Sequence, residues 1–403
     1  MSDAYIFSKE KEIRMKKCIP LSVPNLKGNE LEYVTKAVED EWVSSGGPYI
    51  TAFEKGITEY VGAQGAVACQ SGTAGLHLAM IVSGIGAGDE VIVPALTFIA
   101  TVNPVKYTGA EPIFMDCDDS LCMDMSKVEQ FCAEGCKFNG EKLINNRTEK
   151  QVKAIVVVHL FGNIADMDKL MEIADKYNLI VIEDSTEALG SYVTKGKYTG
   201  KFAGTIGKIG VYSFNGNKIL TTGGGGMIVS DDEAILRRAR HLSTQAKSDE
   251  LYYIHDEIGY NYRMTNLQAA LGLAQLEQLE NFIKTKKENY YLYKERISKI
   301  PGLSILNFKD ENRTNFWFYS LKCEEEYVLN RDEIIQYLSS KGIQSRPIWG
   351  LISEQKGYLN NQAYKIEKAK YYLKHIVNIP CSSNLTKEDV LYVVECLTNP
   401  ELK

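Results

Sequence analysis

Between residues 66 and 183 the sequence alternates short apolar runs with helix-like segments, and this alternation strongly constrains the fold. The apolar runs are residues 66–69, 90–93, 112–115, 152–158 and 179–183. Such runs are typical of strands that are buried on both faces of a mostly parallel sheet, with helices on either side. The sequence therefore predicts a doubly wound α/β domain whose ligands bind beyond the carboxyl ends of its strands.

The C-terminal third has a different pattern. A long helix is expected from just after Met264 to about residue 299, with Leu267, Leu271 and Leu279 on its apolar face. Beyond it, strands are predicted near residues 302–306, 316–323 and 343–346, and helices near 330–341, 362–374 and 386–398. We therefore expect a large domain at residues 19–262, followed by a linking helix and a smaller α+β domain at residues 263–403. Residues 1–18 are predicted to be a charged extension, within which Met15 is an alternative start.

Composition excludes several classes of protein. The net charge of −6 gives no basic surface for nucleic acid. No apolar run has the length of a membrane span, and the N-terminus lacks the apolar core of a signal peptide. The nine cysteines include no CxxC pair, and no nearby histidine supports a zinc site, so we expect no metal site. We expect the cysteines to be reduced thiols in the cytoplasm.

Small, polar and acidic residues follow several predicted strands. Gly72 and Thr73 open a helix after the first strand, and N–H groups and hydroxyls at such a helix start bind phosphate, although Ser-Gly-Thr is also an ordinary cap. Phe98 follows the second strand, either as a core side chain or as a ring at the site. Asp184 and Glu187 lie in a run of three carboxylates, which rarely occur at strand ends without a cation or a polarised ligand.

The segment from residue 212 to 226 contains the best candidate for chemistry. A strand-like run, residues 209–214, ends in a polar turn that presents Lys218, and four glycines then lead into the run 227–229. A lysine beside Ser213 and beside backbone without side chains suits a Schiff-base lysine with a phosphate nearby. The alternative is a glycine-rich hairpin with an exposed lysine, and the residues at the other strand ends favour the first interpretation.

Three other sequence features are weaker candidates for a functional site. Two of them have alternative interpretations, and the third is rejected. The loop at residues 42–47 is either a turn or a segment that lines the substrate. His159 ends the strand 152–158, either as a polar edge residue or as a catalyst. The glycine spacing at residues 84–88 is similar to a dinucleotide fingerprint, but it follows a helix and precedes a strand, which is the wrong order.

Together these motifs resemble the vitamin B6 enzymes of the aspartate aminotransferase fold (fold type I), and more narrowly the DegT-type sugar-nucleotide aminotransferases. The matching runs are SGTAGLHLA, PALTFIAT, IEDSTEALG, YSFNGNK and GYNYRMTNLQAAL. The similarity is specific from about Ile19 to Ile300 and weaker beyond. It implies bound pyridoxal 5'-phosphate (PLP), a nucleotide-sugar substrate, L-glutamate as amino donor, and a homodimer with shared active sites.

The resemblance also implies residue roles. Lys218 is the lysine that binds the cofactor covalently and moves a proton between the substrate carbon and the cofactor. Asp184 pairs with the pyridine nitrogen and keeps it protonated. The other implied cofactor contacts are Gly72, Thr73 and Ser213 at the phosphate, Phe98 stacked on the ring, Glu187 near it, and Asn261 reaching the phosphate of the neighbouring subunit.

The expected substrate follows from one residue that departs from the pattern of the family. Many family members carry His or Gln where this chain has Glu187, and that Glu, with HLFGN, FNGNK and MDCDD, resembles the branch that acts on UDP-4-keto-6-deoxy-N-acetylglucosamine. This branch transfers the amino group of L-glutamate to C4 of the sugar in bacillosamine and legionaminic acid pathways. A GDP-perosamine synthase and a C3 sugar aminotransferase are the alternatives. The candidate substrate contacts are Ser44, His159, Asn163 and Arg263. In the smaller domain the candidates are Tyr319, Arg346 and Trp349, for which a purely structural role is an equally good explanation.

Two related classes of protein do not fit the sequence. Sugar 3-dehydratases resemble this family but replace the lysine with histidine, so Lys218 favours transamination. A PLP-binding regulator that kept the fold would be expected to lack Lys218 or Asp184, or to carry a DNA-binding domain, and neither is the case.

Overall fold

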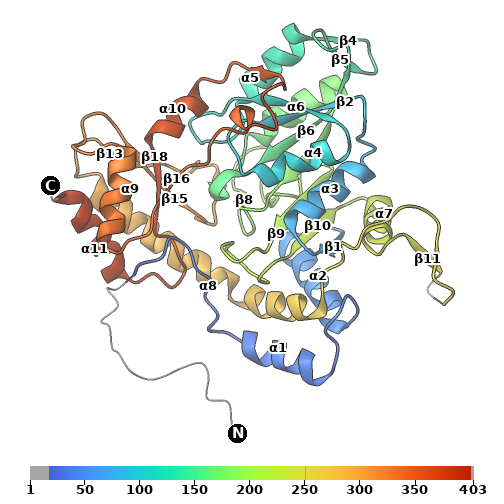
Figure 1. Cartoon of the computed structure of the whole chain (residues 1–403), viewed down its shortest axis with the longest axis horizontal. Helices are drawn as coiled ribbons and strands as arrows, with labels where there is room; N and C mark the ends of the chain where they lie inside the picture. Colours follow the sequence, from blue (N-terminus) through green and yellow to red (C-terminus); the bar gives the residue numbers. More distant parts are fainter. Residues whose placement is uncertain (1–17, 250, 401–403) are drawn as a thin grey trace.

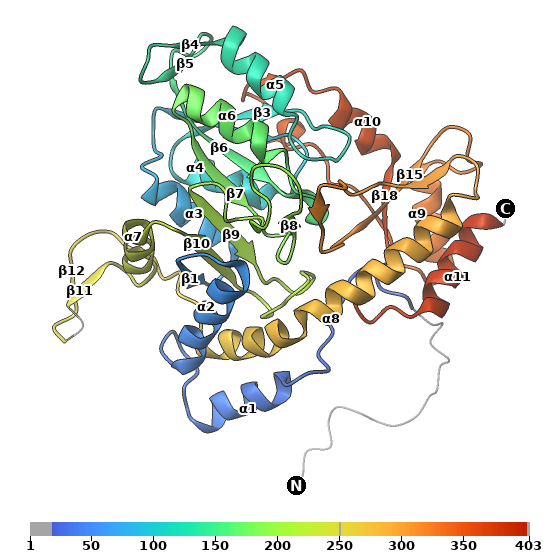
Figure 2. The same ribbon diagram turned by 180° about the vertical axis from the view of Figure 1, so that it is seen from behind.

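The computed structural model describes residues 18–249 and 251–400. Most of the predicted N-terminal extension, residues 1–17, lies outside this part of the chain. The described residues form a ten-stranded sheet, a four-stranded sheet and two two-stranded sheets, and a long helix runs from beside the first to beside the second (Figures 1 and 2).

The large sheet has ten mostly parallel strands, which confirms the predicted fold class. They are β1 (Gly65–Cys69), β2 (Asp89–Pro94), β3 (Glu111–Met115), β4 (Cys136–Phe138), β5 (Leu143–Asn145), β6 (Gln151–Val158), β7 (Ile180–Asp184), β9 (Ile209–Ser213), β10 (Gly226–Ser230) and β17 (Ala363–Tyr364). The order is β1-β10-β9-β7-β6-β2-β3-β17, and the β4–β5 hairpin pairs with β6. Strands β9, β7, β6, β2, β3 and β17 are parallel to their neighbours in that order, whereas β10 is antiparallel to β9 and β1.

Helices cover both faces of this sheet. One face packs against α3 (Gly72–Val82), α4 (Asn103–Tyr107) and α7 (Glu233–Ser243), and the other packs against α2 (Pro48–Val61), α5 (Met125–Gln130), α6 (Met167–Tyr177) and the start of α8 (Asn266–Ile297). Successive strand side chains alternate between the faces. Val211 and Ile228 therefore join the first core, whereas Tyr212 and Met227 join the second. Burial on both faces explains why these strands are apolar throughout.

The small sheet is antiparallel, in the order β13-β15-β18-β16. Its elements are β13 (Leu303–Ile305), β15 (Tyr319–Cys323), β16 (Arg346–Pro347), β18 (Ile376–Ile379), α9 (Arg331–Ser340), α10 (Lys368–His375) and α11 (Lys387–Thr398). Helix α8 has 32 residues and spans about 48 Å. It contacts α2 near its start and β13 and α11 further along.

The remaining short elements connect these layers. They are α1 (Glu30–Glu39), β8 (Tyr192–Val193), β14 (Asn312–Arg313), β11 (Lys247–Asp249), β12 (Ile254–His255), the π-helix η2 (Phe131–Gly135), and the 3₁₀ helices η1 (Ile99–Thr101), η3 (Leu160–Gly162) and η4 (Ile352–Glu354). Strand β14 pairs with β8, which ties the segment after α8 to the large sheet's loops.

The structure differs from three local expectations. Helix α10 begins at residue 368 rather than near 362, because residues 363–364 pair with β3 as an edge strand of the large sheet. Strand β18 was not predicted. The sequence also predicts a helix at residues 231–241 that is capped by Asp231. In the structure Asp232 caps α7 by accepting hydrogen bonds from the N–H groups of Ala234 and Ile235, whereas Asp231 accepts one from the Gln64 N–H.

Helix α1 also turns a different face inward from the one its apolar residues predict. Its buried residues are Glu30 and Ala37, whereas Leu31 is 80% exposed and Val38 is 53% exposed. The Glu30 carboxylate accepts hydrogen bonds from the Gly28 N–H at 2.7 Å and the Gln275 amide at 2.5 Å, which satisfies it in its buried position. The predicted apolar face of α1 is therefore exposed in the single chain.

Candidate active site

Several sequence-predicted residues meet in one cavity of about 290 Å³ at the carboxyl ends of the parallel strands. Its lining includes Gly72, Thr73, Phe98, Asp184, Glu187, Ser213 and Lys218. Because β7 and β9 are parallel neighbours, the residues that end them, Asp184 and Ser213, reach the same edge of the sheet. The sheet topology therefore brings together residues that are up to 146 positions apart in the sequence.

Asp184 is a buried carboxylate that is held by hydroxyl and backbone donors. It ends β7 and is 2% exposed. The Thr101 hydroxyl donates to one carboxylate oxygen at 2.7 Å, and the Thr186 N–H donates to the other at 3.1 Å. Among the described residues, Asp184 has no ion pair. A buried carboxylate that faces a cavity in this way is suited to a cationic nitrogen of a ligand.

Lys218 lies in the turn after β9, and its ammonium group contacts Glu187 and Trp317. Its Nζ is 3.4 Å from Glu187 Oε1 and 3.9 Å from the centre of the Trp317 ring. The other Glu187 oxygen accepts a hydrogen bond from the Phe161 N–H at 2.9 Å. Burial raises the pKa of Glu187, and the nearby Lys218 charge partly opposes this rise.

The N-terminus of α3 forms another wall of the cavity. Ser71 caps the helix by accepting a hydrogen bond from the Ala74 N–H at 3.1 Å, and Gly72 and Thr73 follow. A Cβ atom added at Gly72 would lie 2.8 Å from the Ser213 Cβ, so only glycine allows the two segments to approach this closely. The N-terminal end of a helix and two hydroxyls, those of Thr73 and Ser213, are thus available for an anion.

These donors fit PLP. The start of α3 with Ser213 suits its phosphate, the buried Asp184 suits its protonated pyridine nitrogen, and Lys218 suits its aldehyde carbon. Phe98 is 49% exposed and lines the same cavity, and its ring lies 5.9 Å from the Trp349 ring. The site therefore has a complementary group for each polar end of the cofactor.

The comparisons with known proteins decide the family. The sequence model of the DegT/DnrJ/EryC1/StrS aminotransferase family matches residues 24–398. This chain belongs to that family. It is a PLP-dependent sugar-nucleotide aminotransferase.

Individual relatives agree with this assignment. The chain is 41% identical over 384 residues to the GDP-perosamine synthase of Escherichia coli O157:H7, covering 94% of this chain and 98% of that protein. It is 37% identical over 381 residues to the GDP-perosamine synthase of Caulobacter vibrioides, with 94% and 97% covered. Spr1654 of Streptococcus pneumoniae, a putative sugar aminotransferase solved in PLP and PMP forms, superposes with a TM-score of 0.84 at 25% identity. The match covers 94% of this chain and 98% of the PLP form or 97% of the PMP form.

Three of the substrate contacts expected for this aminotransferase lie elsewhere and have structural partners. His159 is fully buried, where its Nε2 lies 2.8 Å from Glu183 and its Nδ1 accepts from the Ala165 N–H at 3.2 Å. Asn163 is also buried; its side chain donates to Ser120 O and accepts from the Lys309 N–H.

The third, Arg263, forms an ion pair with the buried Glu54 and hydrogen bonds to Ala68 O. None of these three residues lines the Lys218 cavity of the single chain, and their roles as substrate contacts stay predictions. The two other predicted residues outside this cavity, Ser44 and Asn261, are exposed.

The structure adds residues to the aminotransferase site that sequence reasoning missed. Thr101 belongs to the quoted run PALTFIAT, but its role depends on its contact with Asp184. Trp317 comes from the segment before β15, and its indole N–H donates to Asn217 O at 2.8 Å, which fixes the ring beside Lys218. Trp349, which the sequence left open, lines the same cavity. No local motif marks Trp317, because about 100 residues separate it from its partners.

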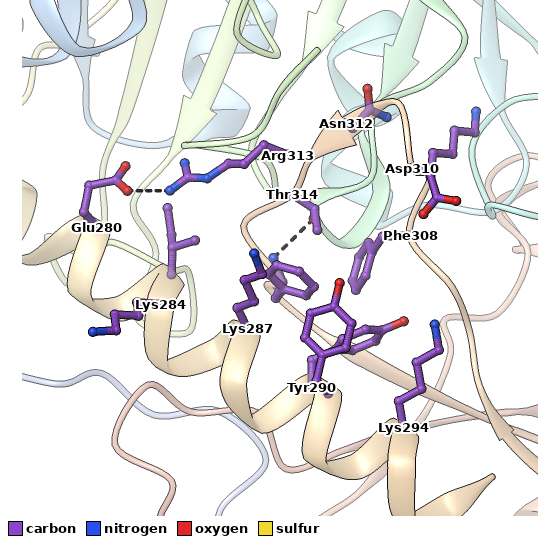
Figure 3. Close-up of a pocket in the computed structure, with 14 residues that line it drawn as sticks. Glu280, Lys284, Lys287, Tyr290, Lys294, Phe308, Asp310, Asn312, Arg313 and Thr314 are labelled. Carbon is purple, nitrogen blue, oxygen red and sulfur yellow. Dashed lines mark hydrogen bonds and ion pairs between the residues drawn. The ribbon is translucent and has the colours of Figure 1, made fainter. Parts of the chain in front are cut away.

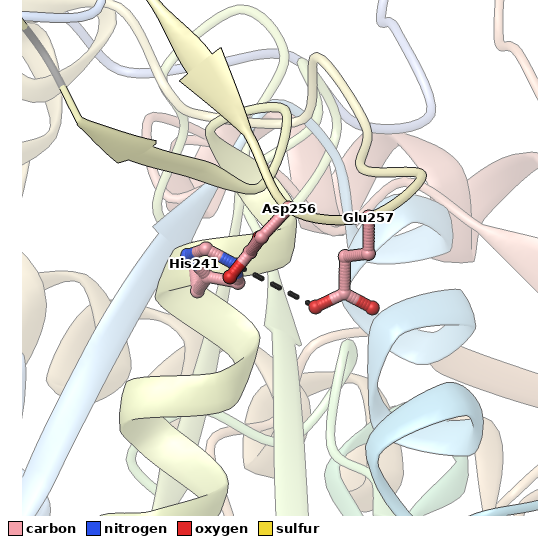
Figure 4. Close-up of side chains that lie close together, drawn as sticks. All are labelled: His241, Asp256 and Glu257. Carbon is pink, nitrogen blue, oxygen red and sulfur yellow. Dashed lines mark hydrogen bonds and ion pairs between the residues drawn. The ribbon is translucent and has the colours of Figure 1, made fainter.

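One further cluster has the composition of a metal site. His241 lies 2.8 Å from Asp256 and 3.5 Å from Glu257 (Figure 4). The Arg238 guanidinium group donates two hydrogen bonds to the Glu257 carboxylate, so this carboxylate is already paired with a cationic side chain. We interpret the cluster as an ion-pair network that fixes the segment after β12 onto α7.

Within the described residues, no helix of this aminotransferase is both long and apolar enough to cross a membrane.

Proposed function

We propose that this enzyme transfers the amino group of L-glutamate to C4 of a nucleotide-linked 4-keto-6-deoxy sugar. The observation that carries the proposal is the convergence of Lys218, the buried Asp184 and the start of α3 on one cavity. These three features provide the covalent anchor, the charge partner and the phosphate site that a PLP transaminase needs.

The residue roles follow from these positions. When bound, PLP supplies an electron sink for the carbon that loses a proton. Asp184 holds the pyridine nitrogen in its protonated form, and Lys218 binds the cofactor and carries the proton at its Nζ. Gly72, Thr73 and Ser213 bind the phosphate.

The remaining groups at the cavity position Lys218 and the ring. Glu187 and Trp317 orient the Lys218 ammonium group, because both contact it and both are buried. Phe98 covers one face of the cofactor ring, since it is an aromatic side chain that lines the cavity. Asn261, which is exposed in the single chain, reaches the phosphate in the partner's site.

Two nucleotide sugars are candidates, and the comparisons favour a GDP-linked one. Two relatives with 41% and 37% identity over nearly their whole length are GDP-perosamine synthases. The UDP-linked N-acetylated sugar, with its roles in legionaminic acid and bacillosamine synthesis, is the second candidate. It is supported by Glu187 and the runs HLFGN and FNGNK.

We also propose that the enzyme is a homodimer. Nine of its exposed large apolar side chains lie on α1, on the loop after it and on the segment around the β11–β12 hairpin. They are Leu31, Val38, Trp42 and Val43, and Leu251, Tyr252, Tyr253, Ile254 and Ile258. An apolar area of this kind is typical of a protein–protein interface.

We place the enzyme in the cytoplasm. All nine cysteines are free thiols, and eight of them are buried. Such thiols are typical of a reducing compartment.

The substrate is tested by incubating the PLP-loaded enzyme with L-glutamate and a panel of GDP- and UDP-linked 4-keto-6-deoxy sugars. NMR then identifies the aminated carbon. We expect amination at C4 with the GDP sugar as the preferred substrate. Turnover of UDP sugars alone would establish the second candidate, and amination at C3 would contradict both.

A further inference from the structure

A second cavity, of about 380 Å³, lies between α8 and the segment 308–316 (Figure 3). None of its lining residues belongs to the cavity at Lys218. Its volume is in the range of small-molecule sites. The lining consists of Glu280, Ile283, Lys284, Lys287, Tyr290, Tyr291 and Lys294 of α8, and of Phe308, Lys309, Asp310, Asn312, Arg313, Thr314 and Phe316 opposite.

The lining is basic although the whole chain carries a charge of −6. Five lining side chains are basic and two are acidic. Lys284, Lys287 and Lys294 lie three and seven residues apart, so α8 presents all three on one face. Lys284 and Lys287, three residues apart, repel one another, and an anion bound between them would relieve this repulsion.

The ion pairs of the lining leave Lys284, Lys287 and Lys294 without a carboxylate partner, and the Lys294 ammonium group lies 5.9 Å from the centre of the Tyr290 ring. Arg313 pairs with Glu280 at 2.5 Å, and Lys309 pairs with Asp118, outside the cavity, at 3.3 Å. Within the described residues, Lys284, Lys287 and Lys294 have no carboxylate within 4.0 Å. Three ammonium groups along the cavity are therefore not neutralised by a carboxylate, which favours a ligand with several negative charges.

Aromatic rings form another part of the lining. The Tyr290 ring lies 5.1 Å from both the Phe308 and the Phe316 rings, which makes a packed apolar floor. Tyr291 is 51% exposed, and its ring lies 5.3 Å from the Tyr290 ring. A half-exposed ring beside basic side chains is suited to a planar base, because stacking and charge then act on the same ligand.

We propose that this cavity is a second binding site, for a nucleoside diphosphate. Its phosphates contact Lys284, Lys287 and Lys294, and its base stacks on Tyr291. The proposal stands on this cavity alone and does not depend on which sugar the active site accepts.

The site is also connected to the catalytic cavity. Thr314 and Phe316 line it and flank Asn315, whose amide donates to the carbonyls of Glu187 and Leu189, both at 2.9 Å. Trp317 follows and covers Lys218. A nucleotide bound here therefore contacts the segment that positions Glu187 and Trp317.

The first test is isothermal titration calorimetry of the PLP-loaded enzyme with GDP and with UDP. We expect the variant Lys284→Glu/Lys287→Glu to bind one nucleotide per chain fewer than the wild type, or to bind it at least about ten times more weakly. The matched control Lys356→Glu/Lys387→Glu, at two exposed lysines elsewhere, is expected to bind like the wild type. Equal stoichiometry and affinity in wild type and variant would overturn the proposal.

The second test separates the base from the phosphates. Tyr291→Ala is expected to weaken this nucleotide about fivefold or more and to leave binding of inorganic pyrophosphate unchanged. If pyrophosphate binds the wild type as tightly as GDP and UDP do, the assignment to a nucleoside diphosphate is wrong. Failure of the GDP-sugar assignment would appear only in the turnover panel, so the two results are distinguishable.

Discussion

At the scale of single residues, the site depends on charged groups kept away from water. Asp184 is buried and bonded to Thr101 and Thr186, and Lys218 is bracketed by Glu187 and Trp317. Fixed partners of this kind remove the freedom of each group to turn away from a ligand. The roles of Lys218 and Asp184 can therefore be tested by single substitutions.

Lys218→Ala is expected to remove the covalent link to the cofactor and to lower turnover by about 100-fold or more, because no other lysine lines the cavity. The visible absorbance of the purified protein and its turnover with L-glutamate are the measurements. Lys208→Ala, at an exposed lysine before β9, is the control. An unchanged protein-bound absorbance band in Lys218→Ala would contradict the assignment.

Asp184→Asn is expected to cost far more activity than Glu187→Gln, by a factor of roughly 100, because only Asp184 supplies the charge for the pyridine nitrogen. Glu187→Gln keeps a hydrogen-bond acceptor for Phe161 and loses only the charge near Lys218. Steady-state kcat values for the two variants give the comparison. Equal losses would mean that the pyridine partner has been misassigned.

At the scale of elements, α8 supports both cavities. Its start lies beside the loop of residues 224–225, where the Gln268 amide donates to Gly224 O, and its middle carries the lysines of the second cavity. The helix begins with a capping box in which Thr265 accepts from the Gln268 N–H and Gln268 accepts from the Thr265 N–H. The sequence of α8 therefore fixes where the helix begins.

Thr265→Ala is expected to lower the free energy of unfolding by about 1 kcal/mol, because the N-cap hydrogen bond is lost. Urea denaturation followed by circular dichroism measures the change. Thr285→Ala, inside the same helix, is the control and is expected to be neutral or slightly stabilising because alanine has the higher helix propensity. Equal effects of the two substitutions would show that the cap contributes nothing.

At the scale of the whole molecule, the exposed apolar side chains of α1 and of the segment around the β11–β12 hairpin are unlike an ordinary solvated surface. Leu31 and Val38 have the spacing of an inward helix face, yet Glu30 and Ala37 are the buried residues. Covering this surface with a second copy would remove it from water.

Leu31→Glu/Val38→Glu is therefore expected to convert the dimer to monomers at micromolar concentration, because each charge would be placed in an apolar contact. Size-exclusion chromatography with light scattering measures the mass. Leu391→Glu, at a half-exposed leucine of α11, is the matched control and is expected to leave the dimer intact. A wild-type enzyme that is monomeric in this experiment would contradict the proposal.

The sequence by itself determined seven of the ten strands of the large sheet and the candidate site residues at their ends. This was possible because strands buried on both faces must be apolar along their length, and because parallel strands bring their carboxyl ends to one edge. Lys218, Asp184, Ser213, Gly72 and Phe98 all lie at that edge and line one cavity. Short local patterns carry this information.

The tertiary structure decided which polar residues line the cavity of the single chain. The sequence predicts His159 and Arg263 as substrate contacts, and in the single chain their side chains contact Glu183 and Glu54, which lie far away in the chain. Trp317 and the basic cavity on α8 depend on contacts between segments that no periodicity connects. A side chain's partners are set by packing across the fold, and local sequence does not specify them.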